Sequence, residues 1–154
     1  MSHNSMINTY IVMFLTSFLS GILSSMNVWV DKIEDIRFSL NDCYMALLMT
    51  GWMFLFTGLF FKEHNVILFG FFLVVINIWC IRTQFLISQN QFLLGMIPHH
   101  SMAIHMSKKL LEKENAKKND SESENDSESD NKTIKTFLHY IITTQSKEIE
   151  FMKI

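Results

Sequence analysis

A stretch rich in histidine and methionine lies at residues 96–106, which read MIPHHSMAIHM and contain three histidines and three methionines in eleven positions. Thioether sulfur and neutral imidazole are soft ligands, and together they favour Cu(I) over harder ions. Zinc normally recruits Cys, His or carboxylate ligands instead. The composition therefore points to a copper site. The ordinary alternative is a packing seam, because methionine fills irregular cores well.

Helical spacing sorts these six side chains by direction. On a helix of about 100° per residue, four of them share one face and two point to either side of it. The shared face carries Met96, His99, Met102 and Met106, and the other two residues are His100 and His105. The same face also carries Phe92, Ala103 and Leu110. We therefore expect it to be the seam that packs against a second helix.

Three charge-free runs precede this stretch, at residues 8–30, 43–61 and 65–81. The first is long enough for a helix to cross a hydrocarbon core of roughly 30 Å. The short KEHN hinge between the second and third runs allows only an antiparallel pair of helices. The sequence thus predicts an all-α protein whose first domain, residues 1–82, is transmembrane and has the lipid bilayer as its partner. A soluble bundle would need other partners to cover helices that are apolar all round.

The remaining residues, 83–154, are expected to form a helical hairpin domain. Its first arm is predicted from Thr83 to about Glu114, continuing the third membrane helix, and its second arm begins at Thr133 with apolar residues at three- and four-residue steps. Between them, residues 115–132 are polar and acidic, so they cannot repay the entropy of ordering and form a disordered connector. This connector holds three Asn-x-Ser/Thr sequons, at Asn119, Asn125 and Asn131.

Charge indicates orientation more than function. One candidate side of the membrane carries only Lys62, and the other carries Lys32, Arg37 and Arg82, so the positive-inside rule places the amino terminus outside and the carboxyl-terminal domain in the cytosol. A cleavable signal peptide is not expected, because residues 1–10 have no Lys or Arg. The net charge of -2 and the scattered basic residues exclude a nucleic-acid surface.

Two other groups of sulfur ligands lie in the predicted membrane helices. Met45, Met49 and Met53 recur at four-residue spacing and form one stripe, which resembles the Met-x-x-x-Met feature of eukaryotic copper transporters. A packing stripe facing lipid or a neighbouring helix is the other interpretation. Cys43 and Cys80 are placed at similar depth about the Lys62-Glu63 turn. These features keep an oligomeric copper permease as an alternative function.

The tail motifs FLLGMIPHHSMAIHM and IITTQSKEIEFM resemble the signature of the domain of unknown function 305 (DUF305) family, whose members have a ferritin-like helical core. The layout, with YMALLMTGWM and RTQ, is similar to family members that carry three amino-terminal membrane helices. Some proteins of this family bind copper. The resemblance therefore implies metal handling by the matching positions, which are Met96, His99, His100, Gln145, Glu148 and Met152. Gln89 stands where the family usually has Asp, which argues against a hard or dinuclear centre.

No nucleophile elbow, phosphate loop, HExxH or CxxC motif occurs, so we do not expect an enzyme. We predict a multi-pass membrane protein with a soft-metal module, most simply for a copper ion, that acts in metal buffering or homeostasis. The alternatives are the permease and a membrane interaction protein with no metal, and a homo-oligomer is compatible with each. The predicted metal ligands are His99, His100, Met96, Met102, His105, Met106 and Glu148.

Overall fold

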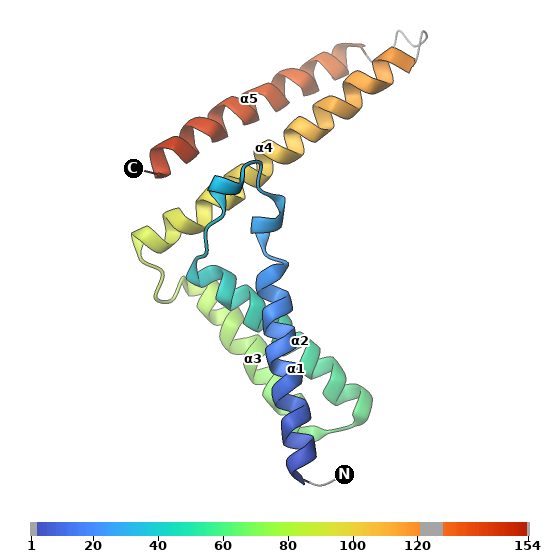
Figure 1. Ribbon diagram of the computed structural model, residues 1–154, viewed down its shortest axis with the longest axis vertical. Helices are drawn as coiled ribbons and strands as arrows, with labels where there is room; N and C mark the ends of the chain where they lie inside the picture. Colours follow the sequence, from blue (N-terminus) through green and yellow to red (C-terminus); the bar gives the residue numbers. More distant parts are fainter. Residues whose placement is uncertain (1–2, 121–127, 154) are drawn as a thin grey trace. The chain divides into compact units, whose positions relative to one another are not determined.

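A computed structural model describes residues 3–120 and 128–153. Within these ranges the chain is entirely helical, which confirms the predicted all-α class. The five α-helices are α1 (His3–Leu23), α2 (Leu40–Phe61), α3 (His64–Thr83), α4 (Gln89–Asp120) and α5 (Glu128–Met152), and two short 3₁₀ turns, Met26–Trp29 and Ile33–Asp35, lie between α1 and α2 (Figure 1). The central part of the predicted acidic connector, residues 121–127, lies outside the described residues.

The chain forms two compact units, and three segments of chain pass between them. The span unit comprises the residues up to Val28 together with Phe38–Gly95, and the hairpin unit comprises Trp29–Arg37 and the residues from Met96 onward. Residues 29–37, called here the α1–α2 loop, therefore belong with the carboxyl-terminal helices. Sequence alone placed a single boundary at residue 82.

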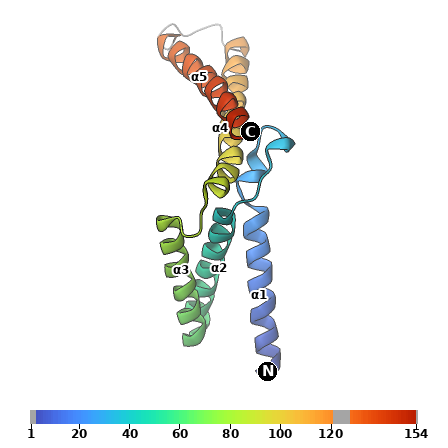
Figure 2. The ribbon, with the colours of Figure 1, turned by 90° about the vertical axis from the view of Figure 1, so that its left-hand side faces the viewer.

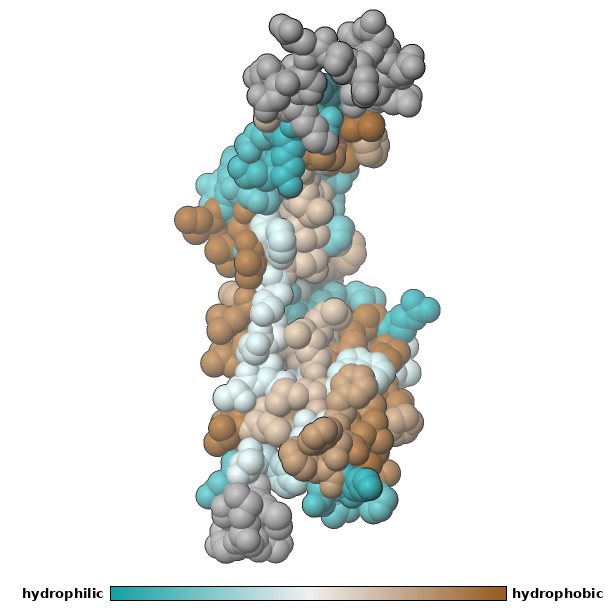
Figure 3. All heavy atoms as spheres, turned by 90° about the vertical axis from the view of Figure 1, so that its right-hand side faces the viewer, coloured by the Kyte–Doolittle hydropathy of each residue, from teal (hydrophilic) through white to brown (hydrophobic). Residues whose placement is uncertain are grey.

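The span unit holds three segments that are long and apolar enough to cross a membrane, namely Ile7–Trp29, Leu40–Phe61 and His64–Thr83. Large exposed hydrophobic side chains cover them, as the brown surface in Figure 3 shows over this unit. Met45 and Met49 of the methionine stripe are exposed, whereas Met53 is half-buried. A groove of about 420 Å³ on these helices is lined by Tyr10, Phe14, Phe54, Phe69 and their apolar neighbours.

Glycines allow α2 and α3 to pack backbone against backbone. A Cβ added at Gly58 would lie 2.7 Å from the backbone N of Ile67, and one added at Gly70 would meet the backbone N of Leu55. Gly21 similarly lets α1 approach α2, because an added Cβ would lie 2.8 Å from the Cα of Ala46. Small residues at such contacts let membrane helices approach closely enough for dense van der Waals packing. Gly70, the one glycine of α3, thus lies in a helix contact inside the unit.

Two predicted helix boundaries were wrong. The first α-helix ends at Leu23 instead of residue 30, and the chain continues in tighter turns, in which Ser25 N donates to the Ile22 carbonyl at 3.2 Å and Val28 N to the Ser25 carbonyl at 3.1 Å. The first hairpin arm does not continue the third helix. Helix α3 ends at Thr83, Gln84 adopts a left-handed conformation with φ of 51°, and α4 begins only at Gln89.

The hairpin unit is built on α4 and α5, which run antiparallel (Figure 2). Ile97, Ile104 and Ile149 form its apolar core, with Ile142 and Met152 packed against them. Further along the arms, Lys135 Nζ donates a hydrogen bond to Asn115 Oδ1 at 2.8 Å. The arms extend to Asp120 and from Glu128, so helix reaches further into the predicted connector than composition suggested.

Candidate metal centre

The helix face that packs inside the hairpin differs from the predicted seam. On α4 the buried positions are Ile97, Pro98, Ser101, Ile104, Ser107 and Leu111, and all but Pro98 recur at three- and four-residue steps. The predicted seam residues Met106 and Leu110 are 54% and 42% exposed, and His99 is exposed as well. The predicted buried face was therefore wrong, because the face that is buried is rotated around the α4 axis by about the angle between consecutive residues. The β-branched isoleucines fill the core in place of the methionines.

His100 and Glu148 are the predicted ligands that the fold brings together from different helices. His100 Nδ1 lies 2.9 Å from Glu148 Oε2, at an ion-pair distance but without the angle of a hydrogen bond. The His100 side chain is 14% exposed, whereas that of Glu148 is 47% exposed. The carboxylate of Glu148, on the second arm, thus lies beside the imidazole of His100.

The electrostatic surroundings of His100 favour the neutral imidazole. Burial lowers the pKa of His100, Glu148 opposes this, and the neighbouring His99 lowers the pKa further, so that the net pKa lies below the ordinary value. The two histidine rings lie with centroids 6.0 Å apart. A neutral imidazole is the form that binds a metal ion.

Helix register places two methionines beside this pair. Met96 precedes His100 by four residues, and Met152 follows Glu148 by four, so each lies one turn along the same helix face. Because the arms run antiparallel, sequence register places both methionines on the same side of the pair. Both are half-buried, and Met152 packs against the core. Register alone thus places each thioether one helical turn from the imidazole or the carboxylate on its own helix.

The other predicted ligands lie elsewhere on α4. Met102 is about 200° around the helix from His100, and His105 about 140°. Both are half-buried, while His99 and Met106 are exposed. Gln145, which the family resemblance implied, is half-buried on α5. Within residues 3–120 and 128–153, no three His, Cys, Asp or Glu side chains are grouped so that they could hold a metal ion. A site in this part of the chain would thus need thioether ligands.

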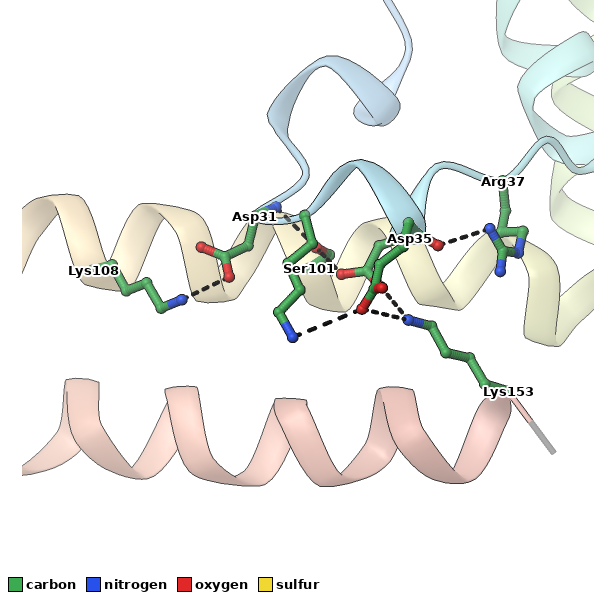
Figure 4. Close-up of polar contacts among 8 residues, drawn as sticks. Asp31, Asp35, Arg37, Ser101, Lys108 and Lys153 are labelled. Atoms are coloured by element: carbon green, nitrogen blue, oxygen red, sulfur yellow. Dashed lines mark hydrogen bonds and ion pairs between the residues drawn. The ribbon is translucent and has the colours of Figure 1, made fainter.

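A polar network that sequence reasoning missed lies next to this pair. Asp35 of the α1–α2 loop is 3% exposed, and Ser101, which follows His100, is fully buried. Ser101 Oγ donates to Asp35 Oδ2 at 2.7 Å and accepts from the backbone N of Asp31 at 2.9 Å. Lys153 Nζ, from the end of α5, donates to Asp35 Oδ1 at 2.6 Å (Figure 4). We call Asp35, Ser101 and Lys153 the polar clamp.

Further contacts hold the α1–α2 loop around the clamp. Lys108 Nζ of α4 donates to Asp31 Oδ2 at 2.6 Å, and Lys153 Nζ lies 3.5 Å from Glu34 Oε1. Arg37 folds back and donates to the carbonyl oxygens of Glu34 and Ile36. Figure 4 shows Lys108 and Lys153 reaching from α4 and α5 toward the two aspartates.

The pKa values of the clamp agree with a charged pair. Burial by itself would raise the pKa of Asp35, but the hydrogen bonds from Lys153 and Ser101 and the positive charges of Lys153 and Lys32 bring it below its usual range. The hydrogen bond to Asp35 raises the pKa of Lys153. Neither partner has a local sequence signal, because Asp35 and Lys153 are 118 residues apart. Ser101 gave no indication either, because the sequence predicted a different face of α4 to be buried.

Comparison with known proteins gives two matches and one negative result. The family described as "Domain of unknown function (DUF305)" matches residues 87–154. "Uncharacterized protein L153" of Acanthamoeba polyphaga mimivirus is 44% identical over 116 residues, which are 72% of this chain and 74% of the relative. The segment aligned with this relative is longer than residues 87–154, so the similarity extends into residues before 87. No solved structure matches the chain.

Proposed function

We propose, from the premise that this chain belongs to the DUF305 family, that it is a multi-pass membrane protein whose helical hairpin binds a soft metal ion, with Cu(I) as the best fit. The observation that carries the proposal is the approach of His100 and Glu148 from two helices to 2.9 Å. The module acts in metal buffering or homeostasis and is held at a membrane by the three spans.

The donor set fits a soft ion. His100 would supply a neutral imidazole, and Met96 and Met152 would supply thioethers, which bind Cu(I) well and harder ions poorly. Metal-ligating histidines commonly donate the second ring N–H to a carboxylate, which fixes the tautomer and raises ligand basicity. Glu148 beside Nδ1 suits that orienting role, and Nε2 is then the nitrogen for the metal. This modifies the sequence-based expectation that Glu148 is itself a ligand.

Membrane attachment rests on separate support. Three helices have the length and apolar character of spans, and the similarity to the mimivirus relative continues upstream of residue 87. We further propose that the spans form a three-helix anchor with the hairpin on the cytosolic side, following the excess of Lys32, Arg37 and Arg82 over Lys62.

A membrane interaction protein without metal is the second candidate. It is favoured by the lack of a group of three His, Cys, Asp or Glu side chains among the described residues. In that case, His100 and Glu148 are an ordinary half-buried polar pair of the hairpin.

Metal analysis separates these candidates. The full chain, purified in mild detergent under reducing conditions, should bind Cu(I) near one equivalent, and His100→Ala should abolish binding. Met96→Leu should weaken binding while keeping side-chain volume. His139→Ala is the matched control, because His139 is an exposed histidine of α5. Absence of bound Cu(I) in the unsubstituted chain would overturn the metal proposal and leave the interaction protein.

A further inference from the structure

We propose that Asp35 is the positioning residue of the hairpin's metal site, holding α4 and α5 at the separation at which His100 and Glu148 meet. The inference deepens the proposed function and rests on it. It assigns a role to a residue of the α1–α2 loop, outside the residues 87–154 that match the family.

The geometry of the contacts carries the inference. Asp35 uses one carboxylate oxygen for each arm: Oδ2 accepts from Ser101 at 2.7 Å, and Oδ1 accepts from Lys153 at 2.6 Å. Ser101 directly follows His100, and Lys153 lies five residues after Glu148. One carboxylate therefore bridges the two helices within about a turn and a half of the proposed site.

Burial makes this bridge hard to exchange for water. Asp35 is 3% exposed and Ser101 is fully buried, so a carboxylate that lost either arm would remain desolvated without its partner. Short hydrogen bonds to an ionised group are also stronger than neutral ones and more restrictive in geometry. The contact therefore fixes the distance between α4 and α5 and also stabilises their packing.

Near the proposed site, the arms otherwise meet through an apolar cluster of Ile97, Ile104 and Ile149 with two partly buried neighbours, Ile142 and Met152. The buried Leu111 and Leu138 and the Lys135–Asn115 hydrogen bond lie further along the arms. The small cluster supplies limited stability and tolerates small shifts of one helix past the other. A metal site loses affinity when its ligands are misplaced by about 1 Å. The clamp supplies the missing constraint.

Asp35 itself is a poor candidate for a ligand. Both oxygens already accept hydrogen bonds, and the Lys153 ammonium would compete with a cation. Its effect on the metal should therefore be indirect. Because the α1–α2 loop continues at both ends into the first two spans, the functional module includes this loop as well as the carboxyl-terminal helices.

The test uses the full chain in mild detergent and the variants Asp35→Asn and Lys153→Met. Cu(I) affinity, measured by competition with a chelator, should fall about 10- to 100-fold in each, as for residues that orient a ligand, while stoichiometry is retained. Lys153→Arg should restore affinity to within a few fold. Glu150→Gln is the matched control, because Glu150 is an exposed acidic residue of α5.

A second readout requires no metal. Spin labels at the exposed positions Lys109 and Lys147, in a chain with Cys43→Ala and Cys80→Ala, report the distance between α4 and α5. Asp35→Asn and Lys153→Met should broaden this distance distribution, and Glu150→Gln should not. If Asp35→Asn fails to fold, Lys153→Met is the deciding variant, because the Lys153 side chain is partly exposed.

The outcomes are separable. Absence of Cu(I) binding in the unsubstituted chain overturns the proposed function, and the distance distribution then decides whether Asp35 positions the pair. An unchanged distribution in the clamp variants, or affinity within twofold of the unsubstituted chain where Cu(I) binds, overturns the inference.

Discussion

The span unit and the hairpin unit are both helical, but they are held together by different forces. In the span unit, Gly58 and Gly70 let helix backbones touch. In the hairpin unit, a small isoleucine core is supplemented by a buried Asp35 between Ser101 and Lys153. Close contacts between helix backbones hold the first unit together, and this kind of packing is common between membrane helices. Where water competes, directional charged contacts set the geometry of the second.

The largest expected effect lies in the span unit. Gly70→Leu should lower the free energy of unfolding by more than about 3 kcal/mol, because the new side chain has to displace the backbone of α2 at Leu55. Gly95→Ala is the control, since its added Cβ would meet only the Ser39 side chain, at 3.1 Å. Thermal unfolding of the full chain in detergent measures both. Equal losses would contradict the close-packing account.

The next effect tests the corrected hairpin seam. Ile104→Ala should destabilise the hairpin by about 2–3 kcal/mol, because it removes buried methyl groups from a small core. Leu110→Ala, at the exposed position that sequence reasoning assigned to the seam, should have an effect below about 1 kcal/mol. Helical signal during thermal unfolding provides the comparison. A larger effect at Leu110 would restore the original seam.

Acid should weaken the hairpin unit selectively. The pKa of Asp35 is lower in the folded protein than in the unfolded chain, so its contribution is fully present above the unfolded value of about 4 and is lost as the pH falls through the folded pKa. At neutral pH, Asp35→Asn should be less stable than the unsubstituted chain by about 1–3 kcal/mol. The difference between their unfolding midpoints should shrink below pH 4. A constant difference down to pH 2 would show that the Asp35 charge is not responsible.

The smallest expected loss of stability comes from removing a hydrogen bond between side chains at the surface. Lys135→Met removes a hydrogen bond to Asn115 at 2.8 Å, but both side chains lie at the surface, so the change should be below about 0.5 kcal/mol. Lys153→Met removes a contact of similar length to a buried carboxylate and should have a several-fold larger effect. Unfolding midpoints of the two variants at pH 7 make the comparison. Equal shifts would mean that burial of Asp35 adds nothing.

The predictable part of the candidate site was its composition. The local His/Met composition identified His100, the family resemblance implied Glu148, and the antiparallel hairpin followed from two periodic segments separated by a polar one. Which α4 face is buried was not predictable in the same way. The sequence offers two equally regular stripes on α4. One contains Phe92, His99, Met106 and Leu110, and the other contains Ile97, Ser101 and Ile104. Their spacing alone does not show which stripe is buried. Only the position of α5 and of the α1–α2 loop distinguished them.

The sequence by itself determined the all-α class, three helices of membrane length and the hairpin that follows them, because these depend on local hydropathy and periodicity. The tertiary structure alone decided that residues 29–37 join the carboxyl-terminal helices and that Asp35 pairs with Lys153. The physical reason is that an ion pair between positions 118 residues apart leaves no periodic trace in the chain. It exists only where folding has excluded water from a carboxylate and brought the ammonium group to it.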